Sequence, residues 1–130
     1  MGTVLQVEVS AGELIDKITI LEIKAERIVD AGKLANVHRE LRSLTATREE
    51  ALAPSPELDE FTAELRRINE RLWEIEDDIR DCERNGDFGE RFIELARAVY
   101  RTNDRRAAAK RSINELLGSE LVEEKDYAAY

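Results

Sequence analysis

The sequence predicts an all-α protein: a four-helix antiparallel bundle of two shorter and two long helices, with a short N-terminal β-strand and an irregular C-terminal tail. Apolar residues recur in steps of three and four over most of the chain, which is the helical period. The 130 residues include only two prolines and six glycines, and 38% are charged against 42% hydrophobic. This composition is typical of one helix-rich domain over residues 1–130, large enough to bury a core without disulfides.

The N-terminal segment predicts the single strand. Apolar and polar residues alternate in VLQVEV, residues 4–9, as they do in a half-buried strand. One strand alone is not stable, so it needs a partner edge. That partner is either the tail, residues 118–130, or the same strand of a second copy.

The first helix is expected over residues 11–31. Ser10 and Glu13 form a capping box at its start. Gly32 can take the left-handed conformation that ends a helix, and the apolar register shifts there, so a second helix follows over 33–53. The first helix is apolar on two faces, so it is either central in the fold or shared with another subunit. One face consists of Leu14, Ile18, Leu21, Ala25 and Ile28, and the other contains Ile20 and Ile23.

The two long helices are expected over residues 56–84 and 89–117. Ser55 is a good cap and Pro56 suits the first helical position, whereas Asn85-Gly86-Asp87 predicts a turn and Gly118 a stop. The third helix carries an unbroken coiled-coil seam. It consists of Leu58, Phe61, Leu65, Ile68, Leu72, Ile75, Ile79 and Cys82.

The last helix turns polar where its core-facing stripe should continue. After Phe92, Leu95 and Val99, the stripe reaches Asn103, Arg106, Lys110 and Asn114. Either the final turns are solvated or they form a semi-buried polar pocket, and buried cations require anions. Those anions are either carboxylates of the protein, with Glu22, Glu76 and Glu94 as candidates, or a bound ligand. The candidate anion site comprises Tyr100, Asn103, Arg106, Lys110, Asn114 and Glu22.

Carboxylates three residues apart on a helix can hold Mg²⁺ in all-helical nucleotide pyrophosphatases. Glu74 and Asp77 have this spacing, and so do Asp78 and Asp81, although a solvated acidic face explains these pairs as well. Glu13 and Asp16 are the candidate pair on the first helix. One cysteine and one histidine are too few for a structural zinc site. We therefore expect no metal and no cofactor.

The formal charge of −9 opposes binding to nucleic acid. No apolar run approaches 18 residues and the start lacks signal-peptide features, so we expect no membrane span and a cytoplasmic location. The favoured function is a non-enzymatic helical interaction module, homo-oligomeric through the first helix or the strand. The alternative is a small enzyme acting on an anionic metabolite, related to chorismate mutase or to Mg²⁺-dependent nucleotide pyrophosphatases. Lys17 and Lys24, one heptad apart, are further candidates for holding carboxylates in such an enzyme, or form a solvated stripe.

Four phrases together resemble a family of small helical proteins of bacteria and phages whose function is not assigned. They are VEVSAGELIDKITILEIKAERI, LWEIEDDIR, FIELARAVYRTNDRRAAAKRSIN and GSELVEEKDY. The resemblance covers nearly the whole chain. It implies a supporting role beside glycosyltransferases or other cell-surface polysaccharide functions, with a glycosyltransferase as a possible partner. It implies no catalytic residues.

Overall fold

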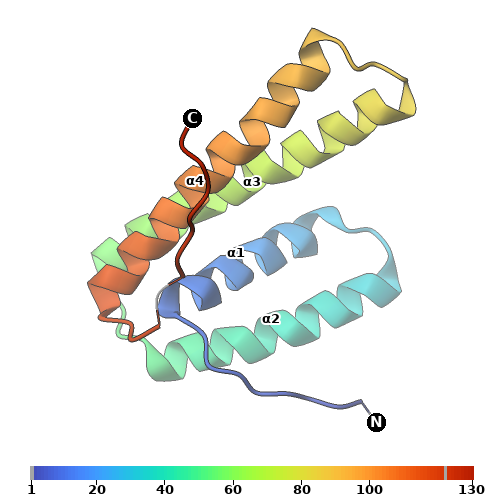
Figure 1. Ribbon diagram of the computed structural model, residues 1–130. Helices are drawn as coiled ribbons and strands as arrows, with labels where there is room; N and C mark the ends of the chain where they lie inside the picture. Colours follow the sequence, from blue (N-terminus) through green and yellow to red (C-terminus); the bar gives the residue numbers. More distant parts are fainter. Residues whose placement is uncertain (1, 122) are drawn as a thin grey trace.

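The computed structural model describes residues 2–121 and 123–130, and this part of the chain is all-α, as predicted. Four helices follow one another as two hairpins (Figure 1). The first hairpin joins α1 (Ala11–Arg27) to α2 (Ala31–Ala51), and the second joins α3 (Pro56–Arg84) to α4 (Glu90–Leu117).

Helix α1 is the central element, because it contacts each of the other three helices, whereas α2 contacts α1 alone. Ile15 is fully buried in a cluster with α3 and α4 residues. Leu14, Ile18 and Leu21 are also buried, and α2 is the helix that remains to cover them. Of the two roles predicted for a helix with two apolar faces, the central one is found.

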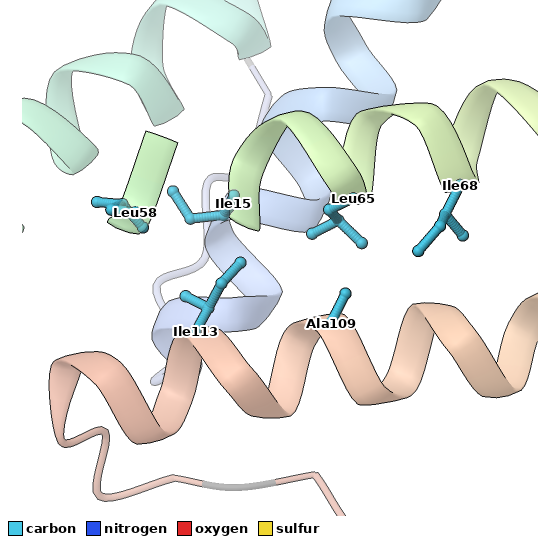
Figure 2. Close-up of a cluster of buried hydrophobic side chains, with 6 residues drawn as sticks. All are labelled: Ile15, Leu58, Leu65, Ile68, Ala109 and Ile113. Atoms are coloured by element: carbon cyan, nitrogen blue, oxygen red, sulfur yellow. The ribbon is translucent and has the colours of Figure 1, made fainter. Parts of the chain in front are cut away.

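The core runs along the α3–α4 hairpin in two clusters. The larger one joins α1 to this hairpin and consists of Ile15, Leu58, Leu65, Ile68, Ala109 and Ile113 (Figure 2). The second, Ile75, Cys82 and Leu95, lies nearer the turn between α3 and α4. The predicted α3 seam therefore packs against α4, and supercoiling of the pair stays a prediction.

The ends of the long helices follow local chemistry. Ser55 Oγ accepts a hydrogen bond from Leu58 N at 3.1 Å, and Pro56 is the first residue of α3. Gly86 in the turn and Gly118 after α4 both have positive φ, 65° and 62°, which glycine adopts without steric cost.

The connection between α1 and α2 differs from the prediction. Helix α1 ends at Arg27, and Asp30 is the N-cap of α2, accepting from Lys33 N at 2.9 Å. Gly32 lies inside the first turn of α2 and has no positive φ. Asp30 thus begins the second helix, and Gly32 does not end the first, because an aspartate oxygen satisfies a free amide of a new helix.

The predicted strand over residues 4–9 is wrong. Residues 2–10 are extended without strand pairing, and the exposed fractions of Val4, Leu5 and Val7 are 86%, 82% and 77%. The described tail residues lie on α4 instead of beside this segment. Alternation reports which side chains share a face, but a strand also needs a partner edge.

Helices α1 and α4 approach each other closely at Gly12. A Cβ built on Gly12 would lie 2.4 Å from the backbone oxygen of Lys110 and 3.0 Å from Asn114 Oδ1. A backbone oxygen cannot swing away as a flexible side chain can, so only glycine permits this approach.

We expect Gly12→Ala to separate α1 from α4 and to lower the free energy of unfolding by about 1–3 kcal/mol, the usual cost of overpacking. Chemical denaturation would measure this. Gly32→Ala is the matched control, since it adds a methyl group to an exposed helix with only the Asp30 carboxylate nearby, at 3.3 Å. The control should be neutral or slightly stabilising, and equal losses in both variants would contradict the close-approach argument.

Candidate functional site

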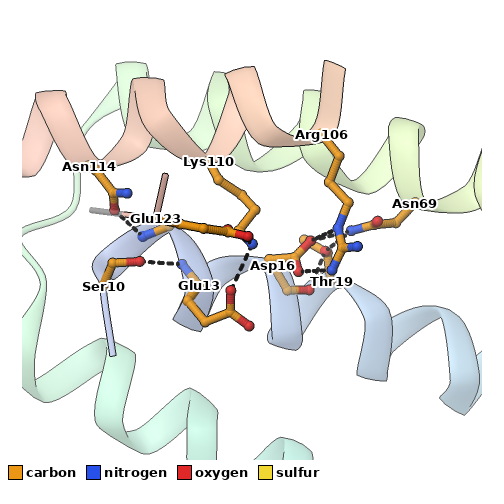
Figure 3. A network of polar contacts seen from close by, with 10 residues as sticks. Ser10, Glu13, Asp16, Thr19, Asn69, Arg106, Lys110, Asn114 and Glu123 are labelled. Carbon is orange, nitrogen blue, oxygen red and sulfur yellow. Dashed lines mark hydrogen bonds and ion pairs between the residues drawn. The ribbon is translucent and has the colours of Figure 1, made fainter. Parts of the chain in front are cut away.

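The carboxylate of Asp16 in α1 is fully buried, with an exposed fraction of 0%. Arg106 of α4 holds it with two hydrogen bonds, Nε to Oδ1 at 2.9 Å and Nη2 to Oδ2 (Figure 3). This hydrogen bond to Asp16 raises the pKa of the Arg106 guanidinium against the opposing effect of burial. The pair joins α1 to α4, and its two residues are 90 positions apart in the sequence.

Asn69 and Thr19 complete the surroundings of the carboxylate. Asn69 Nδ2 of α3 donates to Asp16 Oδ1 at 2.9 Å and to Thr19 Oγ1 at 3.0 Å. Thr19 Oγ1 in turn donates to the backbone oxygen of Asp16 at 2.8 Å. Among the described residues, no buried side-chain polar atom lacks a hydrogen-bond partner. We name these four residues the Asp16 lock, and it connects α1, α3 and α4.

Lys110, one turn after Arg106, is also buried. Its Nζ lies 2.7 Å from Glu13 Oε2 and 2.5 Å from Glu123 Oε2 of the tail. Burial lowers the pKa of Lys110, but the hydrogen bonds that Lys110 donates to Glu123 and Glu13 outweigh burial and raise it. The Ser10–Glu13 capping box is thus half present: Ser10 Oγ accepts from Glu13 N at 3.1 Å, while the Glu13 carboxylate turns to Lys110.

Asn114 completes the polar stripe of α4. Its Oδ1 accepts a hydrogen bond from Gly12 N at 2.7 Å, which satisfies a free amide in the first turn of α1. The stripe is polar because its partners are the Asp16 and Glu13 side chains and a backbone amide of α1. The predicted partners are wrong: Glu22 pairs with Arg66, Glu76 with Arg80 and Glu94 with Arg97.

The tail runs back along α4 and is held by side chains (Figure 1). Besides the Glu123–Lys110 pair, Glu124 accepts from Arg111 at 3.0 Å. Tyr130 donates from its hydroxyl to Asp104 at 2.5 Å. The tail therefore seals the Lys110 end of the stripe against solvent.

A cleft of about 540 Å³ opens on the other side of Arg106, between α1, α3 and α4. Its apolar lining is Ile20, Ile23, Leu72 and Trp73, and its polar lining is Lys24, Asn69, Glu76, Asp77, Arg80, Asn103 and Arg106. Ligand pockets in proteins typically enclose about 300–1,000 Å³ with this mixture of apolar walls and a few polar groups.

The structure brings only part of the predicted anion site together. Asn103 and Arg106 line the cleft, whereas Lys110 and Asn114 lie under the tail. Tyr100 packs edge-on against Tyr130, with ring centroids 5.0 Å apart, and Glu22 lies near Arg66. Arg106 is thus the point where the internal polar stripe meets the cleft.

The predicted Mg²⁺ carboxylate pairs do not come together. Asp78 and Asp81 lie 3.8 and 3.7 Å from Arg91. Glu74 is exposed with Arg71 nearby, while Asp77 lines the cleft. Glu13 and Asp16 each pair with a different cation of α4. Within the described residues, no three His, Cys, Asp or Glu side chains form a cluster that could hold a metal ion.

Sequence reasoning did not identify Asp16 or Asn69 as partners of the polar stripe, and it named Asp16 only as part of a candidate Mg²⁺ pair. A signal existed for Asp16, since it precedes the buried Ile23 by one heptad and therefore shares a core-facing direction of α1. For Asn69, next to the seam residue Ile68, the sequence offers no comparable signal.

Arg106→Leu should leave the Asp16 carboxylate buried without its cation. Breaking a buried pair in this way typically lowers the free energy of unfolding by about 3–5 kcal/mol. Chemical denaturation at neutral pH would measure the loss, and adding Asp16→Asn should recover part of it because no buried charge remains. Arg84→Leu, which removes an exposed pair with Asp81, is the control and should change little. A loss of the same size in this control would contradict the lock.

The ion pair between Glu123 and Lys110 predicts that the attachment of the tail to α4 depends on pH. The hydrogen bond from Lys110 lowers the pKa of Glu123 below its ordinary value of 4.5. A lowered folded-state pKa means that the stabilisation is present above the unfolded value and is lost as pH falls through the folded one. The tail should therefore lose this stabilising contact at pH values below 4.5. Backbone ¹⁵N relaxation should show residues 123–130 becoming mobile in that pH range. Glu123→Gln should raise their mobility at neutral pH too, and a tail equally rigid at all pH values would exclude this attachment.

Comparisons with known proteins give one match. No curated protein and no solved structure matches the chain. None of the helices in the described part of the chain is both long and apolar enough to cross a membrane. A family model described as "Family of unknown function (DUF6165)" matches residues 5–130. With nearly the whole chain matched, the protein belongs to the family of unknown function DUF6165.

Proposed function

We propose that the protein is a non-enzymatic helical interaction module that binds an anionic group of a ligand or partner in the cleft between α1, α3 and α4. The observation that carries this proposal is the position of Arg106, which lines the cleft while Asp16 fixes its guanidinium from behind. Of the predicted anion site, this proposal keeps Asn103 and Arg106 and leaves out Tyr100, Lys110, Asn114 and Glu22.

The Asp16 lock prepares Arg106 for binding. Nε and Nη2 are used by the carboxylate, which leaves Nη1 without a hydrogen bond to any described residue. An arginine held in one orientation loses less conformational entropy when it binds, so its remaining donors are more effective. Asp16 neutralises much of its charge, however, and a second cation is needed to attract an anion.

Lys24 is that second cation. It is half-buried, lines the cleft from α1, and has no ion-pair partner within 4 Å among the described residues. Lys17, one heptad earlier on the same helix, is exposed and does not line the cleft. The two lysines therefore form a natural pair of test and control.

The enzymatic alternative has less support. Its charge-holding residues, Arg106 and Lys110, are separated, because the tail covers Lys110. The Mg²⁺-dependent form needs two facing pairs of carboxylates. Here Glu13 and Asp16 pair with different cations of α4, and Glu74 lies near Arg71 while Asp77 lines the cleft.

Two further expectations remain predictions. Homo-oligomerisation through α1 loses support because three helices contact α1, which leaves the exposed apolar N-terminal segment as the other route. Association with a glycosyltransferase rests on the family resemblance alone.

Thermal unfolding against nucleotides, sugar nucleotides and dicarboxylates tests the proposal. A ligand that binds only the folded state raises the melting temperature by mass action. We expect a shift from at least one anion, lost in Lys24→Met and retained in Lys17→Met. Equal loss in both variants would indicate a nonspecific charge effect, and no shift from any anion would count against the cleft as an anion site.

A further inference from the structure

We propose that the ligand of this cleft is a small zwitterion carrying an aromatic ring, of the size of an aromatic amino acid. This inference rests on the proposed function, since it assumes that the cleft binds an anionic group. It adds a positively charged group and a planar ring to that ligand.

The charges of the cleft point to a ligand with both signs. Glu76 and Arg80 neutralise each other, with Oε2 and Nε 3.3 Å apart. Lys24 from α1 and Asp77 from α3 line the same cleft, and neither has an ion-pair partner within 4 Å among the described residues. Asp77 is exposed at the mouth of the cleft, where water solvates its carboxylate. A zwitterion bound at Lys24 would in addition place a positive group beside Asp77, which an anion alone cannot do.

A neutral polar side chain of the cleft also suits a ligand that carries both charges. Both donor hydrogens of Asn69 Nδ2 are used, by Asp16 and by Thr19, which leaves its Oδ1 as an acceptor in the cleft that Asn69 lines. Asn69 and Asp77 are separated by roughly 12 Å along α3, so one ligand ammonium contacts one of them, and the charged Asp77 is the stronger acceptor. A ligand carboxylate finds donors at Arg106 and Lys24.

The apolar wall points to a ring. Trp73 lines the cleft together with Ile20, Ile23 and Leu72. Arg27 stands over the Trp73 ring, its Cζ 6.0 Å from the ring centroid, and steadies the indole by a cation–π contact. A flat indole edge beside aliphatic side chains favours a planar partner in an offset or edge-on arrangement. The volume of about 540 Å³ accommodates a molecule of this size.

Trp73 is the only tryptophan of the chain, so its fluorescence reports directly on the cleft. We would titrate the full chain with four probes: L-phenylalanine, 3-phenylpropionate, 2-phenylethylamine and L-alanine. L-phenylalanine carries both charges and the ring, and L-alanine carries both charges without the ring. 3-Phenylpropionate carries the ring with a negative charge only, and 2-phenylethylamine carries the ring with a positive charge only. We expect L-phenylalanine to bind most tightly.

Charge variants locate each contact. Asp77→Asn should weaken L-phenylalanine binding by about tenfold, the usual effect of losing a charged hydrogen bond, and should leave 3-phenylpropionate binding unchanged. Lys24→Met should weaken both ligands. Asp78→Asn and Lys17→Met are the controls, because neither residue lines the cleft. Circular dichroism melting would confirm that each variant is folded.

The outcomes separate this inference from the proposed function. If 3-phenylpropionate binds as tightly as L-phenylalanine, the zwitterion is excluded while anion binding stands. If L-alanine binds equally well, the ring is excluded. If 2-phenylethylamine binds more tightly than both L-phenylalanine and 3-phenylpropionate, the inference is overturned. No response to any probe would overturn it too, and the anion panel would then decide the proposed function alone.

Discussion

The arrangement of α1 depends on one buried carboxylate. An ionised carboxylate removed from water is stable only where charges and hydrogen bonds replace its hydration. Asp16 finds these on two other helices, with Arg106 on α4 and Asn69 on α3 (Figure 3). Since neither helix alone satisfies it, α1 must lie where the α3–α4 hairpin presents both groups, and α2 follows because it packs on α1.

A second polar contact fixes how far α1 is shifted along α4. Asn114 accepts from the backbone of Gly12, one turn before Asp16, and the missing Cβ of Gly12 lets the two helices meet there. Apolar contacts such as Ile15 with Ile113 tolerate small shifts, because the hydrophobic effect has no direction. Hydrogen bonds at two successive turns do not tolerate such shifts. The polar stripe of α4 therefore sets the register of α1 along α4, which the apolar core alone leaves open.

Local chemistry explains which parts of this were predictable from sequence. Helix starts at Ser10 and Ser55 and the stop at Gly118 involve neighbouring residues, and they were predicted. The polar stripe of α4 was recognised as unusual, yet its partners on α1 lie 90 to 102 residues away, and the choice among 29 acidic residues required the packing itself. The strand failed for the same reason, since alternation says nothing about whether an edge is nearby.

Arg106 of the Asp16 lock also borders the cleft. An apolar pair in place of Asp16 and Arg106 would fill the helix junction and commonly costs no stability, so the polar pair determines where α1 lies more than how strongly it is held. What the pair adds is an arginine with fixed orientation and an unused donor at the border of a cleft lined by Trp73 and Lys24. Lys17, on the same helix but outside the cleft, lies in solvent, where a charge encounters water alone. The helix crossing that the buried carboxylate fixes therefore places Lys24 in the cleft and leaves Lys17 outside it.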